Sequence, residues 1–211
     1  MEKRNNDELW DEYLYPNTYI LKNLFDIKDF EELKQIEATV TYEKLSELRD
    51  QPFKFNFDSK YLRQLHKFIF GDIYPFAGEY RKVNMRKSNF FLMIHDDNSI
   101  ELYLKQLFES TNSLLKSCSS IQEFSSILSS LYTKLIYCHP FREGNGRTIR
   151  EFIREFSIEK SSELGLGKLE LDWSQINKEE LNKYIEVAHI FPGATTLLFM
   201  NALTEYNNKT L

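Results

Sequence analysis

Residues 139–150 read HPFREGNGRTIR, a stretch that places a histidine, an acid, a Gly-Asn-Gly turn and two arginines close together. His139 has an ordinary side-chain pKa of about 6.5, so it can accept a proton at cellular pH. That property suits a general base that acts on a hydroxyl group. Glu143 offers a hard oxygen ligand, and Mg²⁺ usually binds through one or two carboxylates together with substrate phosphates. The stretch therefore predicts a site for chemistry on a phosphate compound.

The turn inside this stretch has the composition of an anion-binding loop. Gly144 and Gly146 have no Cβ, so the backbone can turn tightly and approach a ligand, and Asn145 tolerates left-handed dihedral angles. Exposed N–H groups in such a turn, followed by a helix N-terminus, attract phosphate oxygens. Arg147 and Arg150 would share one face of that helix, and their guanidinium groups also suit phosphate.

Apolar periodicity predicts a helix on each side of the turn. Before the turn, the segment 121–137 has helical spacing, and the same spacing resumes after it. Pro140 should end the first helix, because the residue before a proline avoids helical dihedral angles. The expected unit is a helix, a short loop and a helix, with His139 at the loop entrance. The apolar positions are Phe124, Ile127, Leu128, Leu131, Leu135, Ile136, Ile149, Phe152, Ile153 and Phe156.

Each of these functional candidates also has an ordinary interpretation. A lone histidine is more often a capping or packed residue, and a lone arginine or glutamate is more often a solvated surface charge. The functional interpretation depends on the combination of His139, Glu143, the Gly-Asn-Gly turn and the two spaced arginines. We prefer it for the stretch as a whole.

The same stretch matches the signature of the Fic family, H-P-F-x-[DE]-G-N-G-R-x-x-R, at every fixed position. Two further segments resemble that family. Residues 62–81, LRQLHKFIFGDIYPFAGEYR, are similar to its second recurring segment, with Phe76 where tryptophan is common. Residues 171–173, LDW, are similar to its I-D-W element. Because the three segments occur in the expected order, the chain resembles Fic proteins over most of its length.

The resemblance implies an all-α fold, namely a Fic-type helical bundle with a small β-hairpin flap over the active site. It also implies transfer of AMP from ATP to a Ser, Thr or Tyr hydroxyl group of a target protein, with Mg²⁺ as cofactor and pyrophosphate as product. His139 would be the catalytic base and Glu143 would hold the Mg²⁺ ion. The nucleotide-binding residues would be Gly144, Asn145 and Gly146 at the α- and β-phosphates, Arg147 at the β-phosphate and Arg150 at the γ-phosphate.

The flap is expected between two β-prone runs. Residues 81–84 have short extended character, and the apolar run 90–94 follows a Ser-Asn pair that suits a hairpin turn. In Fic proteins a hairpin here aligns the target backbone by strand addition, which is a general docking mode. The alternative is an ordinary loop followed by a buried apolar strand. The candidate docking residues are Lys87, Ser88 and Asn89.

The chain has 211 residues, enough for one domain with a sizeable core. We expect a single Fic domain over residues 1–211, with a core at about 55–160, an N-terminal arm and helix at 1–50 and C-terminal helices at 161–211. Residues 29–48 carry a partly helical apolar pattern in that N-terminal part. The net charge of −5 argues against direct nucleic-acid binding, which usually requires a basic face.

The sequence also bears on cellular location. The first eight residues are charged and polar, so no secretory signal is expected there, and no apolar run approaches the ~18–20 residues of a membrane helix. Cys118 and Cys138 lack the spacing of a metal site, and we expect both to be reduced thiols. The expected location is cytoplasmic, without a membrane partner.

Many Fic proteins carry an inhibitory helix with the pattern [ST]-x-x-x-E-[GN], whose glutamate pairs with the second arginine of the signature. Here Glu43 and Glu123 are followed by the wrong residues, and Glu205 lacks the Ser or Thr four positions earlier. The resemblance therefore suggests the toxin of a toxin–antitoxin pair. Its partner would be a small inhibitory antitoxin that supplies a glutamate to Arg150.

Two other functions stay open. Relatives of the Doc type bind the nucleotide in reverse and act as protein kinases, and others transfer UMP or phosphocholine. The intact GNGR sequence at residues 144–147 favours AMP transfer. An inactive binding scaffold belongs to a different functional class, and the intact set of signature residues argues against it.

Overall fold

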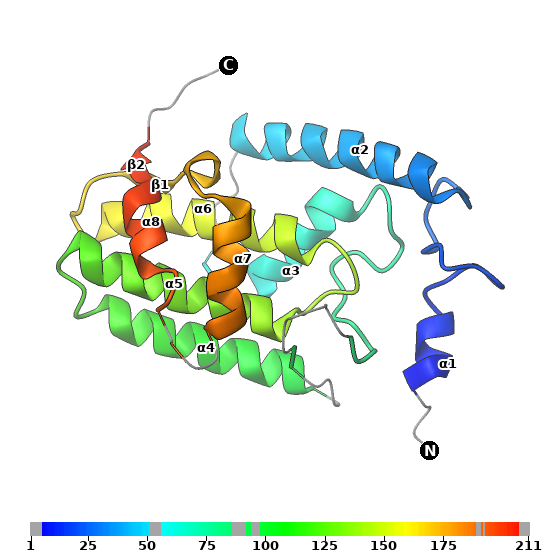
Figure 1. The fold of residues 1–211 in the computed structure, drawn as a ribbon, viewed down its shortest axis with the longest axis horizontal. Coiled ribbons are helices and arrows are strands. Elements are labelled where there is room, and N and C mark those ends of the chain that lie inside the picture. Colours follow the sequence, from blue (N-terminus) through cyan, green and yellow to red (C-terminus); the bar gives the residue numbers. More distant parts are fainter. Residues whose placement is uncertain are drawn as a thin grey trace.

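The computed structural model describes residues 6–50, 56–85, 92–93, 98–188, 191 and 193–206 of the chain. They form a helical bundle, which confirms the predicted all-α fold (Figure 1). None of the described helices is long and apolar enough to cross a lipid bilayer. The α-helices are α1 (Asn6–Asp11), α2 (Phe30–Asp50), α3 (Ser59–Phe70), α4 (Ser99–Leu115), α5 (Ile121–Cys138), α6 (Asn145–Glu163), α7 (Lys178–Val187) and α8 (Thr196–Ala202). The other elements are the strand β1 (Leu169–Leu171), the short 3₁₀-helix η1 (Trp173–Gln175) and the strand β2 (Leu203–Glu205).

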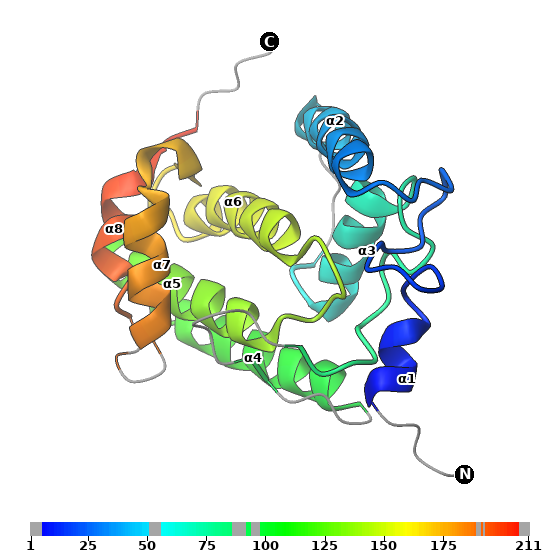
Figure 2. The ribbon, with the colours of Figure 1, turned by 45° about the vertical axis from the view of Figure 1, so that its right-hand side comes forward.

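Helix α6 runs through the centre of the bundle. In Figure 2 it lies between α2 and α3 on one side and α7 and α8 on the other. It packs directly against α3, α5 and β1. Its apolar residues Ile149, Phe152, Ile153 and Phe156 are all fully buried, as their spacing predicted. This burial gives the loop at the N-terminus of α6 a rigid base.

Aromatic rings fill the space between α6, α3 and α4. The ring of Phe57 meets those of Tyr61, Phe152 and Phe156 edge to face, with centroids 5.3 to 5.5 Å apart. Phe108 of α4 lies 5.5 Å from Phe152. Such aromatic pairs contribute about 0.5–1.5 kcal/mol beyond the burial of their area. The cluster therefore fixes the position of α6 relative to its neighbours.

Helix α5 begins and ends close to where the sequence predicted. The Ser120 hydroxyl caps its first turn by accepting a hydrogen bond from the Glu123 N–H at 3.2 Å. The Glu123 carboxylate accepts in return from the Ser119 N–H at 2.8 Å, which completes a reciprocal cap. The helix ends at Cys138, one residue beyond the predicted end, directly before His139 and Pro140.

The N-terminal part of the chain contains more regular structure than its sequence suggested. Helix α2 was predicted over 29–48, and it packs against α3. The arm before it contains α1 and an isolated antiparallel bridge between Leu14 and Leu21. Tyr13 in this arm is buried, and its ring meets that of Phe76 edge to face at 5.1 Å. Aromatic contacts therefore dock the arm on the bundle.

The small sheet lies far along the chain from the predicted flap. Strands β1 and β2 pair antiparallel, with Leu169 opposite Glu205 and Leu171 opposite Leu203. The pairing fastens the end of the described chain to the residues that follow α6. The sequence did not indicate these strands, because three residues are too few to show an alternating pattern.

Most of the predicted flap falls outside the described residues. Residues 81–85 are described and form no strand. Met93 is also described, and its N–H donates to the Tyr137 carbonyl at 2.9 Å. The described end of the segment is thus attached to α5. The predicted docking residues lie outside the described part of the chain and stay a prediction: Lys87, Ser88 and Asn89.

Candidate active site

His139 is the C-terminal cap of α5 and has a left-handed backbone with a φ of 46°. This conformation costs a non-glycine residue about 1–2 kcal/mol, and such strain is typical of functional sites. The residue is 6% exposed, and its Nδ1 lies 3.3 Å from the Ile136 carbonyl oxygen. Because a carbonyl only accepts, Nδ1 carries the proton in this contact. In this tautomer Nε2 is the ring nitrogen that can act as a base.

The backbone of His139 is held by Arg81, which the sequence analysis did not single out. Arg81 is fully buried, and its Nε donates to the His139 carbonyl at 2.8 Å. Its Nη groups donate to the carbonyls of Cys138 at 3.3 Å, Val83 at 2.6 Å and Met93 at 2.6 Å. Burial lowers the pKa of the guanidinium, and no described carboxylate pairs with it. In the sequence, Arg81 could have been noticed as the last residue of the family-like segment 62–81.

Asn145 closes the loop with its side chain. Its Oδ1 accepts from the Phe141 N–H at 2.9 Å, and its Nδ2 donates to the Phe141 carbonyl at 2.7 Å. The residue is 3% exposed. Both ends of the amide are therefore used within the loop, and the group that Asn145 can offer to a phosphate is its backbone N–H.

The first turn of α6 faces the loop and is built for close approach. Gly144 caps the helix with a φ of 75°, and a Cβ there would lie 2.4 Å from the Phe70 ring. At Gly146 a Cβ would lie 3.3 Å from an Nη atom of Arg150. The first N–H groups of a helix have no partner within the helix, and its dipole favours an anion at this end. The first turn of α6 thus has the backbone geometry that the predicted anion-binding turn requires, and its binding role stays a prediction.

Glu143 lies in the loop with a side chain that is 42% exposed. Its Oε1 accepts from the Gly144 N–H at 2.9 Å and lies 4.0 Å from an Nη atom of Arg147. Among the described residues, no cluster of three or more His, Cys, Asp or Glu could hold a metal ion. A single accessible carboxylate fits Mg²⁺, which keeps several waters and takes its other ligands from substrate phosphates.

His66 is packed in the interior and supports the loop. It is 1% exposed, and its Nδ1 accepts from the Gly78 N–H at 2.8 Å. Its Nε2 therefore carries the proton and donates to the Glu143 carbonyl at 2.9 Å. Burial lowers the pKa of His66 to about 4, so the ring is neutral at cellular pH. The ring also stacks on that of Phe141 at 3.9 Å.

The two signature arginines have different surroundings. Arg147 donates to Glu37 Oε1 at 2.5 Å and to Thr41 Oγ1 at 3.3 Å, both on α2. Arg150 is exposed, and no described carboxylate forms an ion pair with its side chain. Its carbonyl accepts from the Trp173 Nε1 at 3.0 Å, so the LDW segment contacts the same helix. The sequence analysis predicted both arginines but not Glu37, because nothing in α2 indicates which bundle residue it will meet.

Arg142 differs from the prediction. It occupies the variable position of the signature, where an exposed side chain is expected, whereas it is half-buried with its guanidinium 4.1 Å from the centroid of the Trp10 ring. Aromatic residues of the N-terminal arm cover it, and sequence distance hides that contact. A pocket of about 280 Å³ adjoins the loop here, lined by Tyr19, Ile20, Leu21, Phe30, Leu33, Lys34, Glu37, Tyr74, Arg142 and Glu143.

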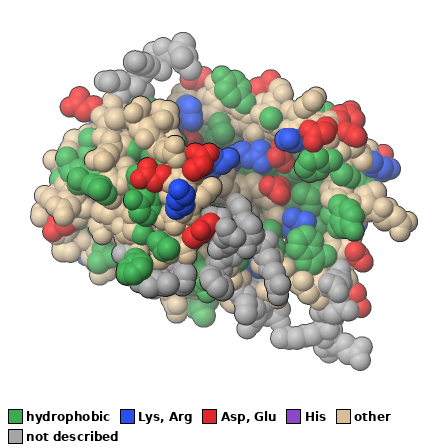
Figure 3. Space-filling view, viewed as in Figure 1, with side chains coloured by type: hydrophobic (Ala, Val, Ile, Leu, Met, Phe, Trp, Pro, Cys, Tyr) green, Lys and Arg blue, Asp and Glu red, His purple; other side chains and the backbone are tan. Residues whose placement is uncertain are grey.

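Charge on the surface is mixed around this region. Figure 3 shows basic side chains beside acidic ones in a band across the face, below the ribbon position of α2 in Figure 1. On the coloured part of that face, positive charge is interspersed with negative charge.

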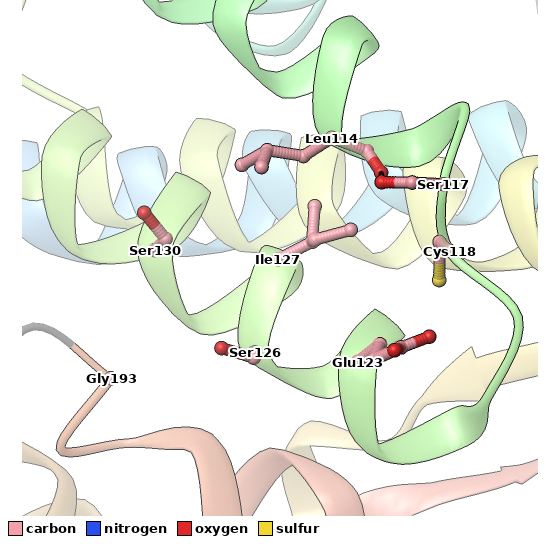
Figure 4. A pocket seen from close by; sticks show the side chains of 8 residues that line it. All are labelled: Leu114, Ser117, Cys118, Glu123, Ser126, Ile127, Ser130 and Gly193. Carbon is pink, nitrogen blue, oxygen red and sulfur yellow. Dashed lines mark hydrogen bonds between the residues drawn. The ribbon is translucent and has the colours of Figure 1, made fainter.

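A second pocket lies away from the loop, between the end of α4 and the start of α5 (Figure 4). It has a volume of about 340 Å³, and no predicted site residue lines it. Cys118 points into it and is a free thiol, as is the buried Cys138. Burial raises the pKa of both thiols, which keeps them protonated and unreactive.

Sequence comparisons agree with the geometry of the loop. A model of the Fic/DOC family matches residues 56–157. Protein adenylyltransferase VbhT of Bartonella schoenbuchensis is 31% identical over 199 residues, 93% of this chain. Probable protein adenylyltransferase y4lH of Sinorhizobium fredii is 30% identical over 163 residues, 76% of this chain and 82% of that protein. The chain spans only 40% of the length of VbhT and 32% of that of a Bartonella henselae adenylyltransferase.

Solved structures share the fold. The BepC protein of Bartonella tribocorum, with bound AMPPNP, superposes with a TM-score of 0.77 at 25% identity, over 93% of this chain and 98% of that one. An N-terminal Fic domain from Bartonella quintana, with bound ADP, gives a TM-score of 0.81 at 26% identity, over 93% and 96% of the two chains. The similarity extends beyond the 56–157 segment and includes most of this chain.

Proposed function

The chain belongs to the Fic/DOC family, and we propose that it is a protein adenylyltransferase that transfers AMP from ATP to a Ser, Thr or Tyr hydroxyl group of a target protein. One observation carries the proposal: the contact of His139 Nδ1 with the Ile136 carbonyl makes Nε2 the basic nitrogen of the ring, and the residue lies directly before the turn that leads into the N-terminus of α6. The names of the relatives and the AMPPNP bound by BepC support the same activity.

Each of the site residues has a separate role in the proposed reaction. His139 takes the proton of the target hydroxyl at Nε2, and the oxygen attacks the α-phosphorus of ATP as the bond to pyrophosphate breaks. The first N–H groups of α6, together with Arg147 and Arg150, bind the phosphate oxygens and stabilise the charge that develops on them. Positioning and charge stabilisation account for most of the catalysis in reactions of this type.

Glu143 is the residue that would hold Mg²⁺, and the bound ion would supply positive charge next to the phosphates. The carboxylate is accessible, and only its Oε1 is engaged by a backbone N–H. Replacement of Glu143 by alanine should therefore lower activity and raise the Mg²⁺ concentration at which activity is half-maximal.

The direct test uses ATP labelled on either the α- or the γ-phosphate, with a cleared cell lysate as the source of acceptor proteins. Transfer of the α label to protein supports AMP transfer. Transfer of the γ label instead would mean a Doc-like kinase, and transfer of neither would favour a binding scaffold. His139→Ala is the matched control, since it should bind ATP without transferring the label.

We also propose that a separate small protein inhibits the enzyme by supplying a glutamate to Arg150, as in a toxin–antitoxin pair. The exposure of Arg150 and the lack of a carboxylate partner among the described residues support this. The proposal predicts that the purified chain is active alone. It is wrong if the chain is inactive and Glu43→Gly or Glu205→Gly activates it.

We further propose that residues 1–211 act as one catalytic unit. Segments on both sides of the matched residues 56–157 contact the helix that carries the signature. Trp173 binds the Arg150 carbonyl from the C-terminal side, and Glu37 binds the Arg147 guanidinium from the N-terminal side.

A further inference from the structure

Arg147 is held by a helix that lies outside the matched family segment. Its Nη2 donates to Glu37 Oε1 at 2.5 Å, and its Nη1 donates to Thr41 Oγ1 at 3.3 Å. Its guanidinium carbon lies 4.7 Å from the centroid of the Phe70 ring. A carboxylate, a hydroxyl group and an aromatic face therefore fix both the position and the plane of one guanidinium group.

Glu37 is itself fixed in place. Its side chain is 14% exposed, and its Oε2 accepts a hydrogen bond from the hydroxyl group of Tyr74. Tyr74 is 3% exposed, and burial followed by the neighbouring Glu37 carboxylate raises the pKa of its hydroxyl, which therefore stays a donor. The hydrogen bonds that Tyr74 and Arg147 donate to Glu37 thus attach the signature arginine to the rigid core.

We propose that Glu37 is a positioning residue, which holds Arg147 in the orientation that stabilises the leaving pyrophosphate. This inference rests on the proposed AMP transfer. A guanidinium has five N–H donors in a planar fork, so it can bind a carboxylate on one edge and an anion on another. Glu37 and Thr41 engage one Nη each, and no other described residue accepts from this guanidinium, which leaves its remaining donors for phosphate.

The competing interpretation is that Glu37 blocks the site by neutralising Arg147 until a nucleotide displaces it. Burial argues against that exchange. If Arg147 moved away, the nearly buried Glu37 carboxylate would lose its cationic partner, and a stranded buried charge is strongly unfavourable. The stacking on Phe70 and the bond to Thr41 would also be lost. Arg147 is therefore expected to bind phosphate while it stays on Glu37.

The test compares Glu37→Gln with Glu32→Gln in the full chain. Both changes remove one carboxylate from α2 and keep the side-chain shape, but Glu32 is exposed. The measurements are the rate of α-label transfer to lysate proteins at saturating ATP, the KM for ATP, the Kd for ATP by calorimetry and the thermal unfolding midpoint. We expect Glu37→Gln to lower the transfer rate at least tenfold, with changes under threefold in Kd and no shift in the midpoint. Glu32→Gln should match the wild type.

Two further variants separate positioning from general damage. Tyr74→Phe removes only the hydroxyl group that orients Glu37 and should lower the rate by a smaller factor. Combining Glu37→Gln with Arg147→Lys should cost no more than Arg147→Lys alone, because both changes act through one guanidinium.

The outcomes are distinguishable. If the wild type transfers no α label, the proposed function is wrong and this inference falls with it. If the wild type is active but Glu37→Gln behaves like Glu32→Gln, or binds ATP more tightly and reacts faster, the positioning role alone is overturned. A lower unfolding midpoint, with rate losses that multiply in the Arg147→Lys combination, would also overturn it.

Discussion

Two arginines lie at the two ends of the loop, and their surroundings are opposite in kind. Arg81 is fully buried behind His139, and its described partners are neutral carbonyl groups. Arg147 is at the other end with a side chain that is 26% exposed, and its main partner is the Glu37 carboxylate. The buried arginine uses its donors within the protein, whereas the accessible one keeps donors for a ligand.

Arg81 and Arg147 differ because the two ends of the loop have different structural requirements. The His139 end must keep a left-handed backbone that costs about 1–2 kcal/mol, and hydrogen bonds from a charged donor contribute about 1.5–3 kcal/mol each. The four carbonyl contacts of Arg81 are enough to offset that strain. In the proposed function the Arg147 end instead accepts a charged ligand, which requires access and a fixed direction.

The largest expected effect is at the base itself. His139→Ala should lower the rate of AMP transfer by about 10²–10⁴-fold, since that is the usual contribution of a general base. ATP affinity should change little, because the phosphates are bound by α6 and the arginines. Label transfer and calorimetry on the same preparation measure both quantities. A variant that keeps the full rate would remove His139 from the mechanism.

The next largest effect is expected at Arg81, which holds the backbone of His139. Arg81→Lys replaces a planar fork with a single ammonium group that cannot reach four carbonyls, so we expect a loss of about 3–5 kcal/mol in unfolding free energy. Arg63→Lys is the control, because Arg63 is exposed and donates to a single carbonyl, that of Gly78, at 2.8 Å. Its expected loss is within about 0.5 kcal/mol. Chemical denaturation measures both, and equal losses would contradict the anchoring role of Arg81.

Substitution of Gly144 should displace the side chains that support Arg147. An alanine there would place a Cβ 2.4 Å from Phe70, the ring on which Arg147 lies, at a φ of 75°. The clash and the strained backbone together should cost about 2–4 kcal/mol and weaken ATP binding. Gly165→Ala is the matched control, because its φ is 70° and nothing lies within 4 Å of its Cβ. It should lose only about 1–2 kcal/mol, and similar values for the two variants would exclude a steric role for Phe70.

The smallest expected effect concerns the charge of Glu155, which lies farther along α6 than the two ends of the loop. Glu155 is nearly buried, its Oε1 has no hydrogen-bond partner among the described residues, and burial raises its pKa to about 7. In the unfolded chain the carboxyl ionises near pH 4.5. Between pH 4.5 and pH 7 the Glu155 carboxyl is therefore protonated in the native state and ionised in the unfolded chain. The stability that this difference contributes is present below pH 4.5 and is lost as the pH rises to about 7.

Glu155→Gln cannot titrate. The unfolding free energy of the wild type relative to this variant should therefore fall by about 2–3 kcal/mol between pH 4.5 and pH 7. Urea denaturation across that range measures it. His66, whose depressed pKa has the opposite effect, is present in both proteins and cancels in the difference. A pH-independent difference would mean that Glu155 is ionised in the native state.

Sequence patterns predicted the long elements well. The helix expected over 29–48 is α2, and the one expected over 121–137 is α5. Both carry many apolar residues at helical spacing, and burial of one face is what stabilises such helices. The three-residue strands β1 and β2 were missed, because pairing between distant segments leaves almost no local signal.

The candidate site divides in a similar way. The sequence indicated His139, Glu143 and the turn, because their residue types and spacing are themselves the chemical requirement. It did not indicate that Asn145 uses its side chain to close the loop, or that Arg142 lies against the N-terminal arm. Those facts depend on which groups become neighbours after folding.

By itself, the sequence determined a helical protein with a glycine-rich turn between two helices, since periodicity, proline and glycine act over a few residues. Only the tertiary structure decided that Arg81 clamps the His139 backbone and that Glu37 holds Arg147. These partners are separated by 58 and 110 positions in the chain. Hydrogen bonds act over about 3 Å, so such pairs exist only once the packed core has brought their helices and loops together.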